Sequence, residues 1–358
     1  MAGPLAGEKP ESAEKLLIGI TIGDPAGIGP EICLKALDRK IPDLIPVVYS
    51  DRIVLEDAVK ITGKKFLLNS ITEPKEAAGQ PGTIDFIETG SIAAPGDYSI
   101  GTISKKSGDA SFRYVEKAIR DALEKKISAV VTCPISKEAV NLAGHHFAGH
   151  TEIFAHYTNT RNYGMLLSAK AGNSGRRLNI IHATTHVSLR EACDLVSRER
   201  VLNAILLAQK ALVLMGSKTK RIAVAGLNPH SSENGLFGTE ENESIIPAVT
   251  EARGMGLDVS GPLPPDTVFV KALGGLFDIT VAMYHDQGHI PLKLCGFSVN
   301  TDAGGFADVS GINTTIGLPV IRTSVDHGTA FDIAGKNLAS DESLVDAIET
   351  AVTFVRNS

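Results

Sequence analysis

Several features that mark particular classes of protein are missing from this sequence. No apolar run is long enough to span a membrane. The first fifteen residues are polar and lack the apolar core of a secretory signal, so we expect 1–15 to form a flexible tail. The four cysteines, Cys33, Cys133, Cys193 and Cys295, lie far apart and form no CxxC pair. We therefore interpret them as reduced thiols of a cytoplasmic protein.

An excess of basic residues is also missing. Lysine and arginine number 35 against 41 aspartates and glutamates, the net charge is −6 and the pI is about 5.9. A nucleic-acid-binding protein would need a basic surface, so we expect no nucleic acid as partner. An anionic small molecule is compatible with this composition, because a few local lysines and arginines can hold it.

What the sequence does contain is an alternation of strand and helix patterns. Its 358 residues, 43% of them hydrophobic, suffice for one large or two ordinary domains. Apolar runs predict strands at 16–24, 128–135, 178–185, 220–228, 278–285 and 318–325. Helical periodicity predicts helices at 111–126, 197–216, 243–256 and 340–357. The alternation predicts a parallel α/β sheet with helices covering its faces.

Polar and ionisable residues follow every predicted strand. The residues at these ends are Asp24, 133–137 (CPISK), His186, His230, 285–289 (HDQGH) and 325–332 (VDHGTAFD). In sheets of this kind, ligands bind beyond the carboxyl ends of the strands. The repeated placement of ionisable groups at these ends therefore predicts an enzyme.

Three of these residues, His186, His230 and His285, stand directly after buried strands. If the strands are neighbours, all three imidazoles project into the same cleft. A single histidine in this position usually caps a strand or bonds a backbone carbonyl. Three at equivalent positions favour a shared divalent metal with open coordination positions, and such a set suits Zn, Mg, Mn or Co.

Two glycine-rich turns precede predicted helices. The segment 23–32, GDPAGIGPEI, places Pro30 and Glu31 in a first helical turn, but it is not GxGxxG, and no Rossmann fingerprint occurs in the chain. A tight turn that lets the helix approach the sheet explains it. In the second, His150 and Thr151 precede a helix, where Thr151 either caps the helix or helps to bind a phosphate or carboxylate.

Cationic and amide donors surround the last strands. Arg322 lies inside the apolar run 318–325, where an unpaired charge is costly, so it must meet an internal carboxylate or a bound anion. Both partners are compatible with the sequence. Lys293 and Asn313 lie nearby in the predicted cleft. The glycine-containing loop 326–337 is either structural or wraps a flat ligand with its backbone.

The motifs, taken in order, resemble those of one enzyme family. They are GDPAGIGPEI, SGDAS, TCPISKEAV, AGHTE, ATTH, GLNPHSSENGLFGTEE, GPLPPDT, YHDQGHIPLK and GLPVIRTSVDHGTAFDIAGK. Each motif alone is a weak indicator of a family. The ordered set, from about Leu17 to the C-terminus, resembles the 4-hydroxythreonine-4-phosphate dehydrogenase family of pyridoxal phosphate synthesis. The first turn and the last loop also look like those of isocitrate and isopropylmalate dehydrogenases. The resemblance implies their two-domain α/β/α fold, which is not a Rossmann domain.

The resemblance also implies an arrangement of domains and subunits. An NAD-side domain would comprise 16–140 and 305–358, and a domain for metal, substrate and dimerisation would comprise 141–304. The active site would lie between the domains and be shared across a homodimer. His186, His230 and His285 would hold the divalent ion, with His285 reaching in from the partner chain.

Further site residues carry over from the family by position. The substrate residues would be His150, Thr151, Lys293, Asn313 and Arg322. The NAD residues would be His327, Gly328, Thr329, Asp332 and Asn337. Asp266 and Asp286 are candidates for orienting the histidines. For the proton acceptor, Lys137 and a water on the metal are both compatible with the sequence.

The substrate implied by the resemblance is a small 4-phosphorylated hydroxy acid that is oxidised at C3 by NAD and decarboxylated. Some relatives act on 4-phospho-D-threonate or 4-phospho-D-erythronate and form dihydroxyacetone phosphate. Others convert 4-phosphohydroxy-L-threonine to 3-amino-2-oxopropyl phosphate. The GHIP that follows YHDQ favours the first group, and the connection 298–312 is longer than is usual in the family.

Two other functional classes compete with a dehydrogenase. Phosphate acyltransferases of the same wider fold group need neither NAD nor three metal-binding histidines. A binding or regulatory protein need not keep the histidines together with Lys293 and Arg322. The placement of these residues disfavours both alternatives, and NADH formation separates the classes.

Overall fold

The structure is a computed structural model that describes residues 15–172, 175–300, 305–309 and 311–358. The predicted tail, apart from Lys15, lies outside these ranges, as does part of the connection 298–312. None of the helices in the described ranges is long and apolar enough to cross a membrane.

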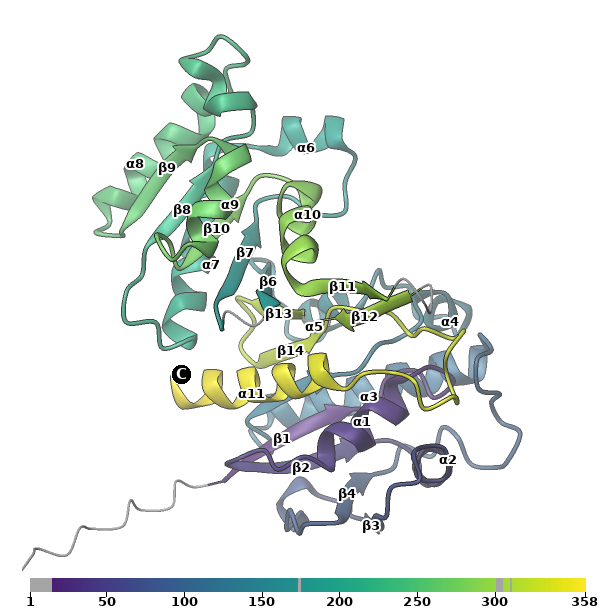
Figure 1. Ribbon diagram of the computed structural model, residues 1–358. Helices are drawn as coiled ribbons and strands as arrows, with labels where there is room; N and C mark the ends of the chain where they lie inside the picture. Colours follow the sequence, from purple (N-terminus) through teal and green to yellow (C-terminus); the bar gives the residue numbers. More distant parts are fainter. Residues whose placement is uncertain (1–14, 173–174, 301–304, 310) are drawn as a thin grey trace, which may run out of the picture.

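Twelve strands form one continuous sheet in the order β3-β4-β2-β1-β5-β14-β13-β6-β7-β10-β8-β9 (Figure 1). Their bounds are β1 Leu16–Thr21, β2 Leu44–Tyr49, β3 Leu67–Ser70, β4 Thr83–Ile87, β5 Ala129–Thr132, β6 Gly164–Lys170, β7 Arg177–His182, β8 Ile222–Ala225, β9 Val259–Leu263, β10 Ile279–Ala282, β13 Ile312–Ile316 and β14 Ile321–Val325. A separate antiparallel pair is formed by β11 (Phe297–Asn300) and β12 (Gly305–Val309). All six predicted strands are confirmed, with shorter ends.

The prediction that the sheet is parallel throughout is wrong. Strand β13 runs antiparallel to both β14 and β6, and β6 runs antiparallel to β7. Only 317–320 connect β13 to β14, and parallel neighbours need a crossover of a dozen or more residues. The turn includes Gly317 at φ +106°, a conformation that side chains other than glycine rarely adopt. The middle of the sheet is therefore mixed and both ends are parallel.

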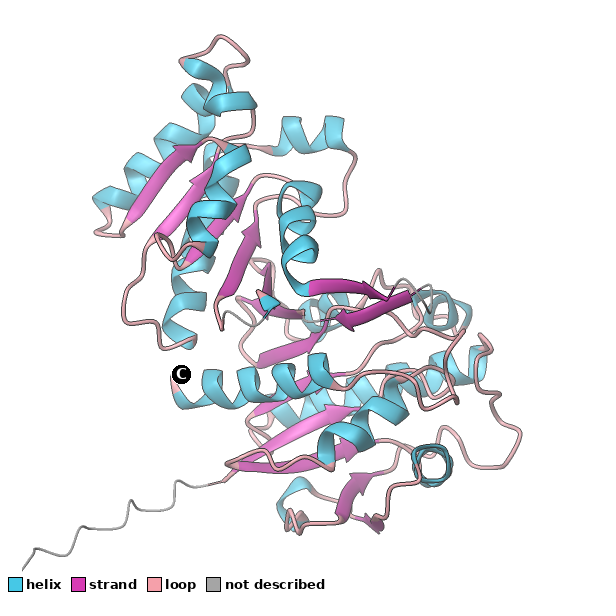
Figure 2. Ribbon diagram, viewed as in Figure 1, coloured by secondary structure: helices cyan, strands magenta, loops and turns pink. Residues whose placement is uncertain are grey.

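Helices lie alongside the strands in both halves of the sheet (Figure 2). Their bounds are α1 Gly29–Leu37, α2 Arg52–Thr62, α3 Lys105–Leu123, α4 Lys137–Leu142, α5 His150–Tyr157, α6 Leu189–Leu195, α7 Arg198–Leu214, α8 Ile246–Gly254, α9 Pro265–Leu273, α10 His285–Gly296 and α11 Glu342–Arg356. The four predicted helices correspond to α3, α7, α8 and α11. The mixed α/β architecture confirms the predicted fold class.

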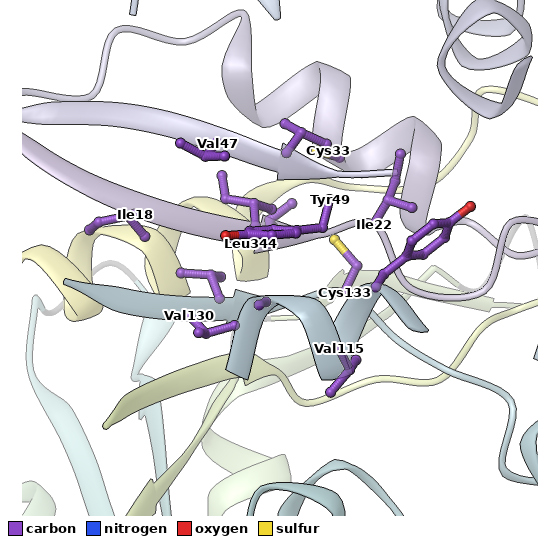
Figure 3. Packing of buried hydrophobic residues seen from close by; sticks show 14 of the residues in the cluster. Ile18, Ile22, Cys33, Val47, Tyr49, Val115, Val130, Cys133 and Leu344 are labelled. Carbon is purple, nitrogen blue, oxygen red and sulfur yellow. The ribbon is translucent and has the colours of Figure 1, made fainter. Parts of the chain in front are cut away.

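The hydrophobic side chains gather in separate cores at the two ends of the sheet. The first lies around β1, β2, β5, α1 and α11, where Ile18, Val47, Val130 and Leu344 are fully buried (Figure 3). The second lies around β7, β8, β10, α7 and α8 and includes Ile181. Each fully buried aliphatic side chain contributes about 1.5–3 kcal/mol. The cores thus fix the strands whose carboxyl ends carry the ionisable residues.

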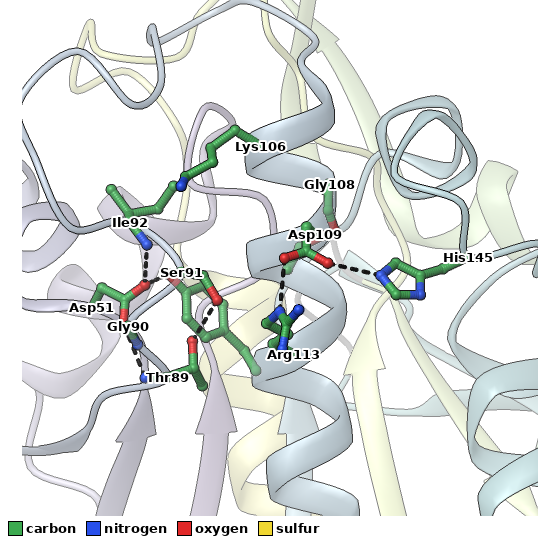
Figure 4. Close-up of polar contacts among 12 residues, drawn as sticks. Asp51, Thr89, Gly90, Ser91, Ile92, Lys106, Gly108, Asp109, Arg113 and His145 are labelled. Carbon is green, nitrogen blue, oxygen red and sulfur yellow. Dashed lines mark hydrogen bonds and ion pairs between the residues drawn. The ribbon is translucent and has the colours of Figure 1, made fainter.

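Polar clusters fix the loops at these strand ends. Asp51, which follows β2, accepts hydrogen bonds from the N–H groups of Gly90 at 2.8 Å and Ile92 at 2.7 Å (Figure 4). Asp109, in the SGDAS motif, lies 2.7 Å from Arg113 and 2.9 Å from His145. The SGDAS motif therefore holds the loop that leads into α5.

Candidate functional site

The three candidate metal-binding histidines follow three adjacent strands. β7, β10 and β8 are neighbours in the sheet, and His186, His285 and His230 come after them in that order. The ring centroids of His186 and His285 are 5.6 Å apart. In the described part of the single chain, no three His, Cys, Asp or Glu side chains are placed to hold a metal ion.

His285 is oriented by its neighbours. Its Nδ1 lies 2.6 Å from Oδ1 of Asp286, which leaves Nε2 as the free ring nitrogen. His289, one turn later in α10, stacks on the His285 ring at 3.6 Å between centroids and contacts the His285 carbonyl through Nδ1 at 2.9 Å. A carboxylate on the second ring nitrogen is the usual companion of a metal-binding histidine. The donor chemistry at His285 therefore fits a divalent ion.

Three histidines near His285, namely His182, His186 and His289, have lowered pKa values. Burial lowers the pKa of His289 to about 4, and burial followed by repulsion from His289 and His285 lowers that of His182 to about 3. Burial and then the positive charge of Lys137 lower the pKa of His186. Neutral imidazole is the form that binds metals.

His230 begins a left-handed turn of the backbone. The φ angles of His230, Ser231, Ser232, Glu233 and Asn234 are all positive, from 44° to 65°. Left-handed backbone costs about 1–2 kcal/mol for each residue other than glycine, so five in succession are a large local strain. Strain of this kind persists where surrounding contacts enforce it, and it is typical of functional sites.

Arg322, on β14, is the most unusual charge in the molecule. Its side chain is 3% exposed, and its Nη atoms donate to the hydroxyls of Thr132 at 2.8 Å and Thr315 at 3.2 Å. Nε is buried without a hydrogen-bond partner, and no carboxylate forms an ion pair with the guanidinium in the described ranges. Burial lowers the pKa of Arg322 to about 9. The negative charge of Glu152 opposes this lowering of the pKa, but no carboxylate forms an ion pair with Arg322 among the described residues.

Two predicted substrate residues, both from α5, lie near Arg322. The hydroxyl of Thr151 lies 3.3 Å from that of Thr315, which itself contacts Arg322. Burial, then the positive charges of Arg322 and Lys137, lower the pKa of His150, and its Nε2 has no hydrogen-bond partner among the described residues. These side chains thus form a cationic cluster with unused donors.

The other predicted substrate residues lie on α10 and β13. Nζ of Lys293 is 3.8 Å from Oδ2 of Asp326 and 4.7 Å from the Phe297 ring centroid. Burial raises the pKa of Asp326, and the charges of Lys293 and His285 oppose that rise. Oδ1 of Asn313 is buried with no hydrogen-bond partner in the described ranges. Asp326 therefore lies within electrostatic reach of both Lys293 and His285.

The loop of predicted NAD residues crosses the N-terminal end of α1. The carbonyl of Thr329 accepts from the N–H of Ile28 at 3.0 Å, and Nζ of Lys35 donates to the carbonyl of Asn337 at 3.0 Å. Gly328 has open space where a side chain would be, and Asp332 is exposed. An exposed, anchored loop with an open glycine fits a flat ligand. The remaining predicted residue, His327, contacts the Gly328 carbonyl at 3.1 Å.

The two predicted orienting carboxylates differ in position. Asp286 contacts His285, as described above. Asp266 lies exposed in the first turn of α9, and its side chain has no ion pair or hydrogen bond to a histidine within the described ranges.

The structure brings Lys137, His150, Thr151 and Arg322 together in one cluster.

Sequence reasoning missed several residues of the site. Thr132 and Thr315 solvate Arg322, Asp326 faces Lys293, and His289 stacks on His285. The alternation along each strand gives a partial signal, because hydroxyl residues inside apolar strands often serve a buried polar group. The contact of Asp326 with Lys293 depends on where α10, which packs on β6 and β7, lies relative to the end of β14, and the sequence pattern does not show this.

Asp24, at the end of β1, is a fully buried carboxyl. Its Oδ1 accepts the N–H of Ala26 at 2.9 Å, and its Oδ2 has no hydrogen-bond partner among the described residues. Burial raises its pKa from 3.8 to about 6, although the hydrogen bond to Ala26 opposes the rise. Folding therefore favours the protonated form.

We expect Asp24→Asn to change the pH dependence of stability. The wild-type protein should lose stability relative to the variant as the pH rises from about 4 to about 6.5, because the buried carboxyl must ionise. The shift corresponds to about 3 kcal/mol at most. Urea unfolding of both proteins at several pH values measures it, and a difference that stays constant with pH would contradict the assignment.

Comparisons with known proteins agree with this geometry. Residues 43–351 match the family model of the pyridoxal phosphate biosynthetic protein PdxA. The chain is 46% identical over 335 residues to a D-threonate 4-phosphate dehydrogenase of Cupriavidus necator, covering 93% of this chain and 95% of that protein. It is 43% identical over 341 residues to the D-threonate 4-phosphate dehydrogenase of Salmonella typhimurium, covering 95% and 99%.

A solved structure extends the likeness to the fold. The 4-hydroxythreonine-4-phosphate dehydrogenase of Klebsiella pneumoniae superposes with a TM-score of 0.80 and 42% identity, covering 95% of this chain and 100% of that one. The likeness spans both ends of the sheet and all the strand ends described above. The chain therefore belongs to the PdxA family, the 4-hydroxythreonine-4-phosphate dehydrogenase family that its ordered motifs resemble.

Proposed function

We propose that this protein is an NAD-dependent and divalent-metal-dependent dehydrogenase. Its substrate is a small 4-phosphorylated hydroxy acid, which is oxidised at C3 and then decarboxylated. The preferred substrate is 4-phospho-D-threonate or 4-phospho-D-erythronate, and the product is dihydroxyacetone phosphate. The dehydrogenase names of the relatives support the reaction class, and the D-threonate names of those from Cupriavidus and Salmonella support the substrate.

The observation that carries the proposal is the unpaired charge of Arg322. A fully buried guanidinium without a carboxylate partner is costly, and a bound anion supplies the missing partner. A planar fork of N–H donors suits a phosphate or carboxylate. Thr151 and His150 add donors beside it, so the cluster fits an anionic end of the substrate.

Each side chain has a distinct task in this proposal. Arg322 and Lys293 hold the anionic groups and so fix the substrate relative to the histidines. His186, His230 and His285 hold the divalent ion, which would lower the pKa of the substrate hydroxyl and stabilise negative charge as carbon dioxide leaves. The loop 327–337 would hold NAD, which would supply the acceptor for the hydride from C3. Lys137 is the candidate among the chain's own residues for accepting the hydroxyl proton.

We propose that a homodimer completes the site. The described part of one chain does not gather three metal-binding groups, and the family resemblance implies that His285 reaches the partner's site. On α10, Ile290 and Leu294 are 58% and 79% exposed, beside the candidate substrate residue Lys293. Two exposed aliphatic side chains one turn apart are typical of a helix that meets a partner.

Comparison of three substrates tests the proposed specificity. We expect NADH formation with a divalent ion to be faster with 4-phospho-D-threonate or 4-phospho-D-erythronate than with 4-phosphohydroxy-L-threonine. Discrimination of a hydroxyl from an amino group at C2 by one or two hydrogen bonds gives about a tenfold to hundredfold ratio of kcat/KM. The measurement is the initial rate over a range of each substrate. A preference for the amino acid would place the protein in pyridoxal phosphate synthesis instead.

A further inference from the structure

The loop that carries His230 is held at its root by a buried acid. Glu241 is 1% exposed, and its Oε1 accepts the N–H groups of Leu227 and Asn228, both at 2.8 Å. Its Oε2 accepts Nδ2 of Asn228 at 2.9 Å. No lysine or arginine forms an ion pair with Glu241 in the described ranges, so its charge is satisfied only by the loop.

A second buried side chain ties the same loop to the next strand. Gln287 is 8% exposed, and its Nε2 donates to the carbonyl of Gly226 at 2.8 Å. Its Oε1 accepts the N–H of Met283 at 2.6 Å, at the end of β10. Gln287 therefore joins the ends of β8 and β10, which lead to His230 and His285.

The left-handed turn starts immediately beyond this clamp. The N–H of Ser231 donates to the carbonyl of Asn228 at 3.1 Å, so the first strained residues rest on the residue that Glu241 holds. Gly226 has no room for a side chain, because a Cβ there would lie 2.7 Å from the Ser231 hydroxyl. The left-handed turn is therefore packed tightly against Gly226 and hydrogen-bonded to Asn228, both of which lie at the base of the loop.

We infer that Glu241, assisted by Gln287, is a positioning residue that forces the 230–234 turn into its left-handed form and so presents His230 to a divalent ion. The inference rests on the proposed metal-binding role of His230. Glu241 and Gln287 lie in the same motifs as His230 and His285, but the proposed chemistry gives neither of them a task of its own. Residues that orient a ligand in this way typically change metal affinity by about 10- to 100-fold.

Titration of the metal-free protein with Co²⁺, followed by its visible absorption, tests the inference. We expect Glu241→Gln to bind Co²⁺ about 10- to 100-fold more weakly than wild type. The NH₂ group of the new glutamine would face the NH₂ group of Asn228, and neither group can accept a hydrogen bond from the other. Gln287→Met, which keeps the length but loses both hydrogen bonds, should weaken binding as well. Glu243→Gln, an exposed acid two residues away, is the matched control and should bind as wild type does.

Two further readouts separate positioning from general stability. Thermal unfolding of the metal-free variants should stay close to wild type, and turnover should recover at saturating metal. Wild-type affinity in Glu241→Gln, or a loss of affinity that only follows a loss of folded protein, would overturn the inference. Absence of saturable Co²⁺ binding by the wild type would instead refute the proposed metal site, and with it the role of Glu241.

Discussion

Replacing Arg322 by methionine is expected to lower kcat/KM by about 10²- to 10³-fold while leaving the unfolding free energy unchanged or up to about 2 kcal/mol higher. The substrate loses the guanidinium that binds its anionic group. The protein, in turn, loses a buried charge that forms no ion pair with a carboxylate in the described ranges and is opposed only by the charge of Glu152 at longer range. Steady-state kinetics and urea unfolding of the same preparation measure the two effects.

Arg177→Met is the control, and we expect it to lower stability while leaving kcat/KM nearly unchanged, which is the reverse of the result expected for Arg322→Met. Arg177 lies 2.7 Å from Asp346, whose side chain is 6% exposed, so its loss leaves a buried carboxylate with Lys170 as its remaining ion-pair partner. We expect a loss of about 1–2 kcal/mol in stability with kcat/KM nearly unchanged. If Arg322→Met destabilised the protein as Arg177→Met does, Arg322 would be a structural charge and the anion site would be wrong.

Replacement of His186, His230 or His285 by alanine should each reduce turnover by at least about 10³-fold and leave the fold intact. Loss of one imidazole would remove a metal ligand and weaken binding of the ion. The bound ion would stabilise the charge of the transition state by several kcal/mol, so its loss should slow the reaction strongly. The measurement combines turnover, circular dichroism and the metal content of each purified variant. We expect metal content and turnover to fall together.

His146→Ala provides the comparison for these three variants. His146 is exposed, contacts the amide of Asn141 at 3.3 Å and lies outside the histidine cluster. Its replacement should leave both turnover and metal content close to wild type. Wild-type turnover in all three histidine variants would refute the metal assignment, whatever the control shows.

Much of the fold follows from local patterns, and what does not has identifiable causes. The runs at β1, β5, β7, β8 and β10 are continuous and apolar, as expected for strands buried on both faces. β2 was missed because Pro46 interrupts its run, and proline argues against a central strand. The antiparallel β13 was missed because its sequence, INTTI, has three polar residues in its middle and forms no apolar run. The predicted strand 318–325 also included part of the turn 317–320 that joins β13 to β14.

The site was predictable where chemistry follows a strand end. The position of His186, His230 and His285 directly after strands follows from the alternation of strands and helices. That the three strands are neighbours was only a condition at that stage, and the structure supplies it. The left-handed turn was not predictable, because His, Ser and Glu rarely adopt positive φ and give no sequence signal for it. The unpaired state of Arg322 also required the structure, since it depends on every neighbour of β14.

NADH formation in wild-type protein supplied with NAD, a divalent ion and 4-phospho-D-threonate is the decisive test of the proposed dehydrogenase activity. We expect steady turnover that a chelator stops and excess metal restores. We expect the same result with 4-phospho-D-erythronate as an alternative substrate. Failure to form NADH from these two acids and from 4-phosphohydroxy-L-threonine, with metal present, would contradict the proposed activity and would favour an acyltransferase instead.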